Sequence, residues 1–146
     1  MSNYLKENDK QNKVLFGDVF FTVSSETPKE IGTASVLLDN IEELYLNSFC
    51  FGYRSNSLQY LSPYFAQYLF RSASFRNKIE KLAQGSTRYN MSKVQLLRLE
   101  ILLPSFKEQT KIANFLSAID EKINHRQTQI EKTEQYKKGL LQQMFV

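Results

Sequence analysis

The stretch PSFKEQTKIANFLSAIDEKI, residues 104–123, opens the longest uninterrupted helical pattern in the chain. Ser105 and Glu108 have the spacing of a capping box, in which each side chain satisfies a backbone donor at the start of a helix. No further proline follows, and the only later glycine is Gly139. The pattern predicts one helix of about 40 residues and ~60 Å, which is much longer than a small domain needs.

Apolar residues recur at seven-residue spacing along the predicted helix, in two interleaved registers. The residues of this repeat are Leu116, Ile119, Ile123, Ile130, Leu140 and Met144. Arg126, Thr133 and Lys137 interrupt it, as is typical of helix pairs whose register is specified. The helix either pairs with a partner helix or lies along its own domain, and its length favours a partner.

The sequence before the long helix begins with strand signals. Residues 14–23 and 32–38 are rich in β-branched and aromatic residues, and turn-forming residues separate them. Both segments therefore predict strands. Residues 44–53 alternate in side-chain character, with apolar side chains at both sets of positions, which predicts a strand buried on both faces.

Helical signals follow these strands. Pro63, preceded by a serine, is typical of the first position of a helix. Residues 74–84 predict a second short helix, with Gly85 as the left-handed residue just beyond its end. Residues 99–103 predict a last strand before the long helix.

These patterns predict an α+β fold in two parts. A small mixed globular domain occupies residues 1–104, and a long coiled-coil helix occupies residues 105–146. The chain has 146 residues, of which 42% are hydrophobic, and this is enough for one domain with a core. Its eleven phenylalanines and eight tyrosines argue against a disordered chain.

Rare residue types exclude several classes of site. Cys50 is the only cysteine and His125 the only histidine, so we expect no internal disulfide and no Cys- or His-rich metal site. The sequence contains no glycine-rich phosphate loop, no HExxH motif and no nucleophile beside a base, so an enzyme is not expected. A polar N-terminus and the lack of a long apolar run predict a soluble, cytoplasmic protein.

Positive charge is concentrated between residues 71 and 98, where seven basic residues and one acidic residue give +6, against +4 for the whole chain. Within this segment QGSTRYNMSK, residues 84–93, interleaves hydroxyl, amide, aromatic and cationic side chains. Phosphates accept hydrogen bonds from Arg, Lys, Ser and Thr, and Arg and Asn can read base edges. The candidate DNA contacts are Ser86, Thr87, Arg88, Tyr89, Asn90 and Lys93. Composition alone favours an ordinary solvated helix face and loop.

A second polar loop, residues 24–29, follows an aromatic segment. It adds Ser25 and Thr27 to the candidate DNA contacts, because hydroxyl groups donate to phosphates. From the sequence alone, an ordinary surface connection explains this loop better.

Fixed positions around the long helix resemble a known family. The matched motif comprises Pro104, Glu108, Gln109, Lys111, Ile112, Ala113, Phe115, Leu116, Asp120 and Ile123. The ending KKGLLQQMF, residues 137–145, matches the usual close of the same motif, and upstream matches in the expected order are residues 17–18, 30–32, 64–69 and 85–88. The chain thus resembles the specificity subunit of type I restriction–modification enzymes, and its upstream part is similar to the later part of a target recognition domain.

The resemblance implies that the chain is a DNA-reading module. The recognition domain would read one half of a split site in double-stranded DNA, and the long helix would pair with a second copy or with the other half of the subunit. Methyltransferase subunits would dock on this scaffold and supply S-adenosylmethionine chemistry. A translocase and nuclease subunit would supply ATP hydrolysis and cleavage, so the chain itself would be non-catalytic and carry no cofactor.

The chain departs from the family pattern in having one recognition domain and one long helix, where the family has two of each. The recognition domain is also short before Gly17. We therefore expect a half-subunit, a C-terminal fragment or a truncated gene product. The alternative is an assembly protein that recruits partners through the helix and has lost DNA binding, and a stand-alone enzyme ranks last.

Overall fold

The computed structural model describes residues 12–145. The chain divides into two compact units, one that ends at Thr110 and one that begins at Lys111. The first unit contains the strands, the three short helices and the first turn of the long helix. The second unit consists of the rest of that helix.

A three-stranded antiparallel sheet forms the centre of the first unit. Its strands, in the spatial order β3-β1-β4, are β1 (Val19–Thr22), β3 (Ala34–Val36) and β4 (Cys50–Tyr53). Val19 and Phe21 are both buried, because alternate side chains of a strand point to the same face. Phe21 lies opposite Ala34 on one neighbouring strand and Phe51 on the other, so the middle strand supplies the centre of the core.

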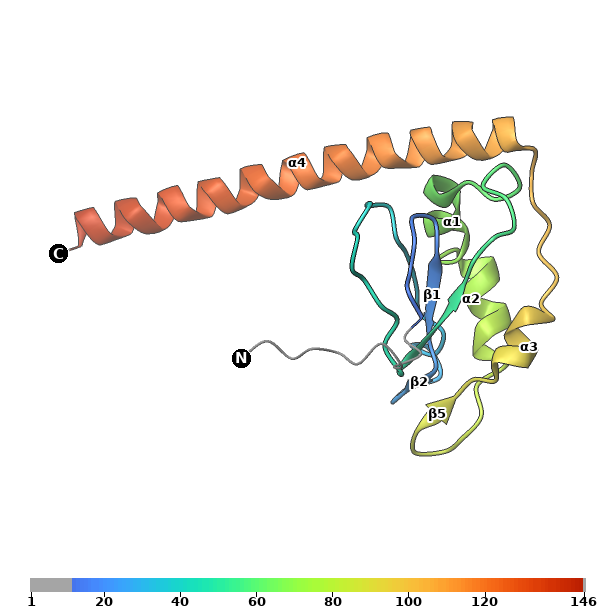
Figure 1. Cartoon of the computed structure of the whole chain (residues 1–146). Coiled ribbons are helices and arrows are strands. Elements are labelled where there is room, and N and C mark those ends of the chain that lie inside the picture. The colour runs from blue at the N-terminus through green and yellow to red at the C-terminus, as the bar shows by residue number, and fades with distance from the viewer. Residues whose placement is uncertain (1–11, 146) are drawn as a thin grey trace, which may run out of the picture. The chain divides into compact units, whose positions relative to one another are not determined.

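Three short helices lie on one side of this sheet (Figure 1). They are α1 (Pro63–Leu69), α2 (Ala73–Glu80) and α3 (Lys93–Leu97). The ring of Phe21 packs edge-on against Phe70 at 5.3 Å between centroids, and Phe70 packs against Phe75 at 4.9 Å. Such pairs add about 0.5–1.5 kcal/mol beyond the burial of their area. An aromatic cluster therefore joins the sheet to the helices, and the predicted α+β class is confirmed.

The long helix, α4 (Phe106–Met144), has 39 residues, as its capping signal predicts. Ser105 N donates to Glu108 Oε2 at 2.9 Å, and Glu108 N lies 3.4 Å from the accepting Ser105 Oγ. The hydrogen bonds from the side chain and backbone of Ser105 lower the pKa of Glu108. Along residues 12–145, no helix combines the length and the apolar character that a membrane crossing requires.

Among residues 12–110, Gln109, in the first turn of α4, is the most buried polar residue, with 1% of its surface exposed. Its Oε1 accepts from the backbone N–H of Ser62 at 3.0 Å. Its Nε2 donates to the carbonyls of Tyr60 and Pro104 at 2.9 and 3.0 Å. A buried amide without partners would cost about 1–3 kcal/mol, so these bonds fix the first turn of α4 next to the loop before α1.

An ion pair joins the residue before β1, Asp18, to the residue after β4, Arg54. Arg54 Nε and Nη2 donate to the two carboxylate oxygens of the buried Asp18 at 2.6 and 2.7 Å, and the backbone N–H of Leu15 adds a third bond at 2.7 Å. Burial alone would raise the pKa of Asp18, but the hydrogen bonds from Arg54 and Leu15 outweigh it and the pKa is lowered. Asp18 therefore stays ionised inside the fold.

The prediction of a strand over residues 44–53, buried on both faces, is wrong in extent and in burial. Only Cys50–Tyr53 forms a strand, and the side chain of Phe49 is 65% exposed. The reason is local, because Asn47 Oδ1 accepts from Phe49 N at 2.7 Å. Such an Asx turn competes with strand pairing and ends the strand early.

Two further sequence predictions are wrong. Gly85 does not end α2, which stops at Glu80, and instead lies in the loop before the short strand β5 (Tyr89–Asn90) with φ +130°. Residues 99–103 form no strand and are tied to α2 through Lys78 Nζ, which donates to Glu100 O at 2.8 Å. Its apolar side chains at Leu99, Ile101 and Leu103 line a pocket, and the segment does not pair with the sheet.

Replacing the exposed partner of the ion pair tests its energetic role. Arg54→Ala leaves a buried carboxylate short of donors and should lower the free energy of unfolding at pH 7 by about 1–3 kcal/mol. Because folding lowers the pKa of Asp18, the contribution is present above about pH 4 and is lost as the pH falls through the lowered pKa. Urea unfolding at pH 7 and below pH ~3 should therefore show a deficit that shrinks in acid.

The matched control for this variant is Arg98→Ala, since the Arg98 side chain is exposed and has no hydrogen-bond partner among residues 12–145. Its free energy of unfolding should stay within about 0.5 kcal/mol of the wild type at both pH values. An Arg54→Ala deficit that does not change with pH would contradict the assigned role of Asp18.

Candidate nucleic-acid interface

The two polar loops singled out in the sequence form one structure. Strands β2 (Ser24–Ser25) and β5 (Tyr89–Asn90) pair in antiparallel fashion, with Ser24 opposite Asn90 and Ser25 opposite Tyr89. We call this pair, together with the loop of residues 85–88, the ribbon. In Figure 1 the ribbon lies at the bottom of the view, where β2 and β5 are labelled. Residues 24–25 and 89–90 lie far apart in the sequence, so no sequence pattern predicted their pairing.

Backbone hydrogen bonds hold the ribbon at both ends. Met91 N donates to Val23 O at 3.0 Å, where β1 passes into β2. Gln84 and Asn90 exchange two bonds, with Asn90 N donating to Gln84 O at 2.8 Å and Gln84 N to Asn90 O at 3.0 Å. The loop between them is therefore closed at its base, and its tip consists of residues 85–88.

Gly85 is required by the geometry of this loop. Its φ of +130° lies where residues with a side chain are strained, and an added Cβ would come within 2.2 Å of the backbone oxygen of Arg88. The glycine thus allows the loop to fold back tightly on itself, and Ser86, Thr87 and Arg88 are exposed as a result.

The structure brings the predicted contacts of residues 84–93 to this exposed loop and its base. Arg88 is exposed, and its Nη2 lies 3.5 Å from Ser24 Oγ on the opposite strand. Asn90 is exposed, whereas Tyr89 is half-buried. Lys93 is exposed at the start of α3, three residues beyond the ribbon. Their roles as DNA contacts stay predictions.

Ser25 and Thr27 are already engaged in the loop that follows β2. Ser25 Oγ donates to Thr27 O at 2.6 Å, and Thr27 Oγ1 donates to Glu30 Oε2 at 2.9 Å. A hydroxyl group has one proton to donate, so in this arrangement each can only accept from a further partner. Phosphate oxygens only accept hydrogen bonds, so neither hydroxyl can donate to a phosphate while these bonds are kept. The loop of residues 85–88 is therefore the better candidate for phosphate contacts.

Apart from Arg88, which lies near Ser24, the basic residues of the +6 segment fall into two groups. In the first, the side chains donate to backbone carbonyls: Arg71 to Ala34 at 3.2 Å, and Lys78 to Glu100 at 2.8 Å. In the second, Lys81, Lys93 and Arg98 are exposed, and no side-chain partner for them exists in the part of the chain that the structure describes. The segment therefore contains fewer available donors than its charge suggests.

Arg76 belongs to the first group and has a role that sequence reasoning missed. Its guanidinium donates to the carbonyls of Lys29, Ile31 and Gly32 at distances of 2.7 to 2.9 Å. These bonds fix the loop that connects β2 to β3, and so one side of the ribbon. No sequence signal distinguishes Arg76 from its basic neighbours, because the partners are carbonyls 44 to 47 residues away.

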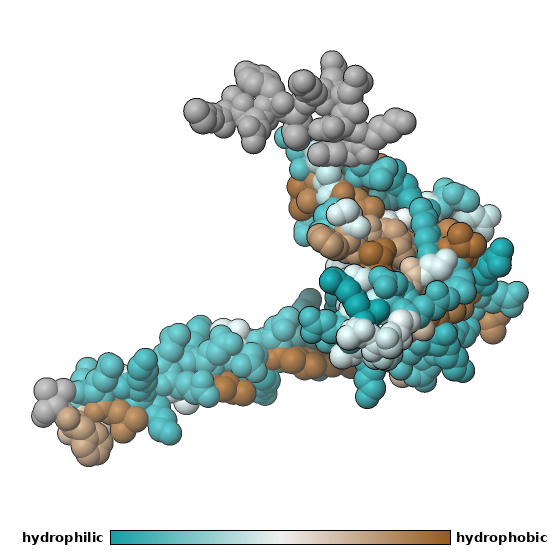
Figure 2. Space-filling model, turned by 90° about the horizontal axis from the view of Figure 1, so that it is seen from below, coloured by the Kyte–Doolittle hydropathy of each residue, from teal (hydrophilic) through white to brown (hydrophobic). Residues whose placement is uncertain are grey.

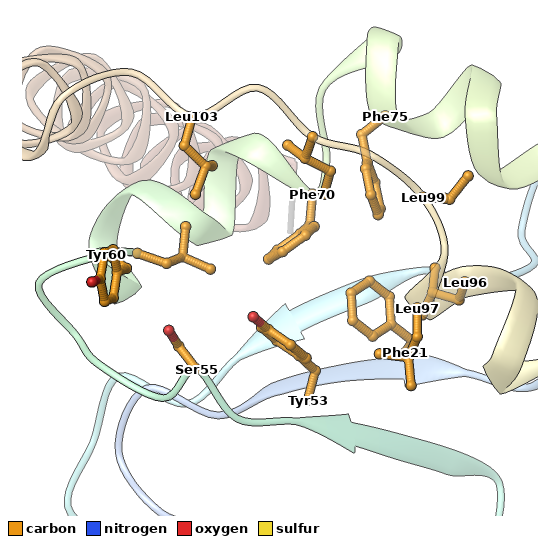
Figure 3. A pocket seen from close by; sticks show the side chains of 12 residues that line it. Phe21, Tyr53, Ser55, Tyr60, Phe70, Phe75, Leu96, Leu97, Leu99 and Leu103 are labelled. Carbon is orange, nitrogen blue, oxygen red and sulfur yellow. The ribbon is translucent and has the colours of Figure 1, made fainter.

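A separate apolar pocket of about 270 Å³ lies between the sheet and the helices (Figure 3). Aromatic rings and leucines line it, and Figure 3 shows Phe21, Phe70 and Phe75 on one side of the cavity and Tyr60 on another. Its lining contains hydroxyl groups but no carboxylate, imidazole or thiol. Between residues 12 and 145, no group of three or more His, Cys, Asp or Glu side chains could hold a metal ion.

In the second unit, the apolar repeat of α4 lies largely in solvent. Figure 2 shows apolar patches spaced along the helix and separated by polar side chains. Apart from Leu116, the exposed fractions of the repeat range from 37% for Ile119 to 71% for Met144, with Ile123 at 59% and Ile130 at 52%. Leu116 is half-buried, and Leu140 is 38% exposed.

Comparisons with known proteins gave matches to a family model, to a curated protein and to a solved structure. Residues 1–135 match the model of the type I restriction modification DNA specificity domain family. A protein described as the type I restriction enzyme MjaX specificity subunit, from Methanocaldococcus jannaschii, is 28% identical over 142 residues, which make up 96% of this chain and 33% of that protein. The crystal structure of the S subunit of a type I restriction-modification system from M. genitalium shares the fold, with a TM-score of 0.63 and 23% identity over 86% of this chain and 31% of that chain. The chain spans about a third of the length of these relatives.

Two glycines of the chain provide a matched test of the ribbon geometry. Gly85→Ala should lower the free energy of unfolding by about 1–3 kcal/mol, because the new Cβ meets backbone and the φ is strained. Gly139→Ala should raise helix stability by about 0.5–1 kcal/mol, since that glycine is inside α4 and nothing lies within 4 Å of an added Cβ. Urea unfolding at one fixed protein concentration measures both, and equal effects at the two glycines would contradict the assigned loop conformation.

Proposed function

The chain belongs to the type I restriction–modification DNA specificity family, and we propose that its first unit reads part of a DNA target site through the ribbon. The observation that carries the proposal is the pairing of β2 with β5. It unites the two polar segments that the sequence singled out separately, and it places their candidate contacts on one exposed structure.

The ribbon has the form and the chemistry that duplex DNA requires. A two-stranded β-ribbon fits into the major groove, where each base pair presents a distinct set of donors and acceptors. Arg88 and Asn90 are exposed and can make two hydrogen bonds to one base edge, and Ser86 and Thr87 can donate to phosphates. We therefore assign base reading to Arg88 and Asn90, and positioning on the phosphates to the hydroxyls and to Lys93.

The second unit supplies assembly in this proposal. Leaving a large aliphatic side chain in water forfeits about 1.5–3 kcal/mol, and several such side chains line α4. A second long helix, from another copy or from the other half of a specificity subunit, would bury them. The apolar end formed by Leu140, Leu141, Met144 and Phe145 would then dock on a partner surface.

The remaining partners follow from the family. Methyltransferase subunits would bind this scaffold and supply S-adenosylmethionine chemistry, and a restriction subunit would supply ATP-driven translocation and cleavage. The chain itself would contribute position and sequence reading, with no catalytic group and no cofactor of its own. A role beside chromosomal DNA fits a cytoplasmic location.

Arg88→Ala tests the assignment of base reading. If Arg88 reads a base edge, the variant should lose about 1–3 kcal/mol of binding to the target and relax the preference at one base pair. The measurement is a titration of the wild type and the variant, each assembled with its methyltransferase subunits. The duplexes are one selected by the wild type from a random pool and one of scrambled sequence, at two salt concentrations.

Arg98→Ala is the control for loss of one exposed positive charge. If it has any effect, it should weaken both duplexes equally, because a phosphate contact carries no sequence information. Arg88→Ala and wild-type curves that coincide would remove Arg88 from the interface. A wild-type complex without salt-dependent DNA binding would overturn the reading function itself and favour a pure assembly protein.

Ile123→Lys tests pairing through α4. The wild-type chain should sediment as a dimer at micromolar concentration, and the variant should be a monomer because a charge replaces a seam side chain. Thr128→Lys is the matched control, since it adds the same charge on the opposite side of the seven-residue repeat. A wild-type monomer, or a dimer that Ile123→Lys leaves intact, would contradict self-pairing through this seam.

A further inference from the structure

A polar cleft of about 480 Å³ lies in the first unit beside β4. Its lining includes three basic residues, Lys13, Arg54 and Lys93, and one acidic residue, Asp18. The segment before β1 forms one wall, because Val14 N donates to Leu44 O and Leu46 N donates to Asn12 O, each at 3.0 Å. The basic residues thus come from three distant parts of the sequence, and no local pattern relates them.

The cleft adjoins the ribbon through the backbone. Met91 N donates to Val23 O at the base of the ribbon, and Lys93 follows two residues later. Asn90 and Lys93 are three residues apart, so their Cα atoms are separated by at most about 11 Å. This distance corresponds to about three base-pair steps along a DNA axis. A duplex held by the ribbon therefore extends within reach of Lys93.

The basic groups of the cleft are available to an anion. The Arg54 side chain is 53% exposed, and the bonds to Asp18 hold its Nε and Nη2. Its Nη1 has no hydrogen-bond partner in residues 12–145, so it can donate outward from a fixed guanidinium. The ammonium groups of Lys13 and Lys93 are exposed, and the same residues offer them no partner. With Asp18 counted, the lining carries a net charge of +2.

We propose that this cleft binds the sugar–phosphate backbone of the DNA whose bases the ribbon reads. The proposal rests on the proposed function and adds Lys13 and Arg54 to the interface. Lysines contact phosphates as flexible point charges, and Arg54, fixed by its ion pair, donates in a set direction. The cleft recognises no base, so it contributes affinity and register without sequence preference.

A charge-matched pair of double variants tests the cleft in the full chain. Lys13→Gln with Lys93→Gln removes two charges from the cleft and leaves the Asp18–Arg54 pair intact. Lys107→Gln with Lys132→Gln removes two exposed charges from α4 and is the control. All four substituted lysines are exposed, so the unfolding midpoints of both double variants should match that of the wild type. The readout is the slope of log K against log salt for selected and scrambled duplexes.

Each phosphate contact contributes about 0.9 to the salt slope, so the cleft double variant should lose about two units of slope, and the control should keep the wild-type value. The loss should be the same for both duplexes. Cys50, the only cysteine of the chain, lines the cleft and provides an independent probe in the wild-type protein. Saturating DNA should slow its reaction with a maleimide several-fold.

The outcomes separate this proposal from the reading function. A wild-type chain that binds no DNA at any salt concentration overturns both. Wild-type binding combined with a control-like slope for Lys13→Gln/Lys93→Gln overturns the cleft alone. An unprotected Cys50 in the saturated complex also overturns the cleft alone, because DNA in the cleft would cover that side chain.

Discussion

The buried amide of Gln109 is the contact on which the start of α4, within the first unit, depends. It occupies the first turn of α4 and makes three hydrogen bonds to backbone groups, two in the loop before α1 and one at Pro104, just before α4. The bond to the backbone N–H of Ser62 is buried, so without Gln109 that donor would lose its partner inside the fold. The starting point of the long helix is therefore set by polar bonds with defined geometry, and a sliding apolar contact could not set it as narrowly. Gln109 thereby fixes the first turn of α4 to the loop before α1 within the first unit.

Local signals explain why the long helix could be predicted from sequence. Ser105 and Glu108 form the capping bonds that their spacing implies, and the lack of proline allows the helix to continue to Met144. The prediction of a strand over residues 44–53 failed because the side chain of Asn47 forms a turn, which the alternating hydrophobic pattern around it does not indicate. In both cases the decisive bond joins residues two or three positions apart. The difference is that a capping box has a recognised spacing, whereas one asparagine within an alternating pattern has none.

The candidate site could be predicted only in its residue types. Arg88 and Asn90 are singled out by their chemistry, but their neighbour Ser24 is 64 residues from Arg88 in the sequence and pairs through a strand of two residues. Such a short strand has no periodicity. Similarly, the net charge of residues 71–98 indicated a basic surface, but it did not indicate which of the basic side chains are available to a ligand. Arg76 and Lys78 donate to backbone carbonyls, and Lys13 and Arg54, outside that segment, share a cleft with Lys93.

The hydrogen bonds from Arg76 to the loop after β2 affect which residues of this domain can be substituted during evolution. The guanidinium holds carbonyl oxygens, which every residue type carries, so its bonds do not depend on the side chains of the loop. Exposed positions such as Glu26 and Lys29 can be exchanged while the path of the backbone is kept. Ile31 and Gly32 are different, because one is fully buried and the other has φ +59°. The loop therefore contains positions that the fold constrains and exposed positions that can be substituted. Its surface next to the ribbon can change while the fold is kept.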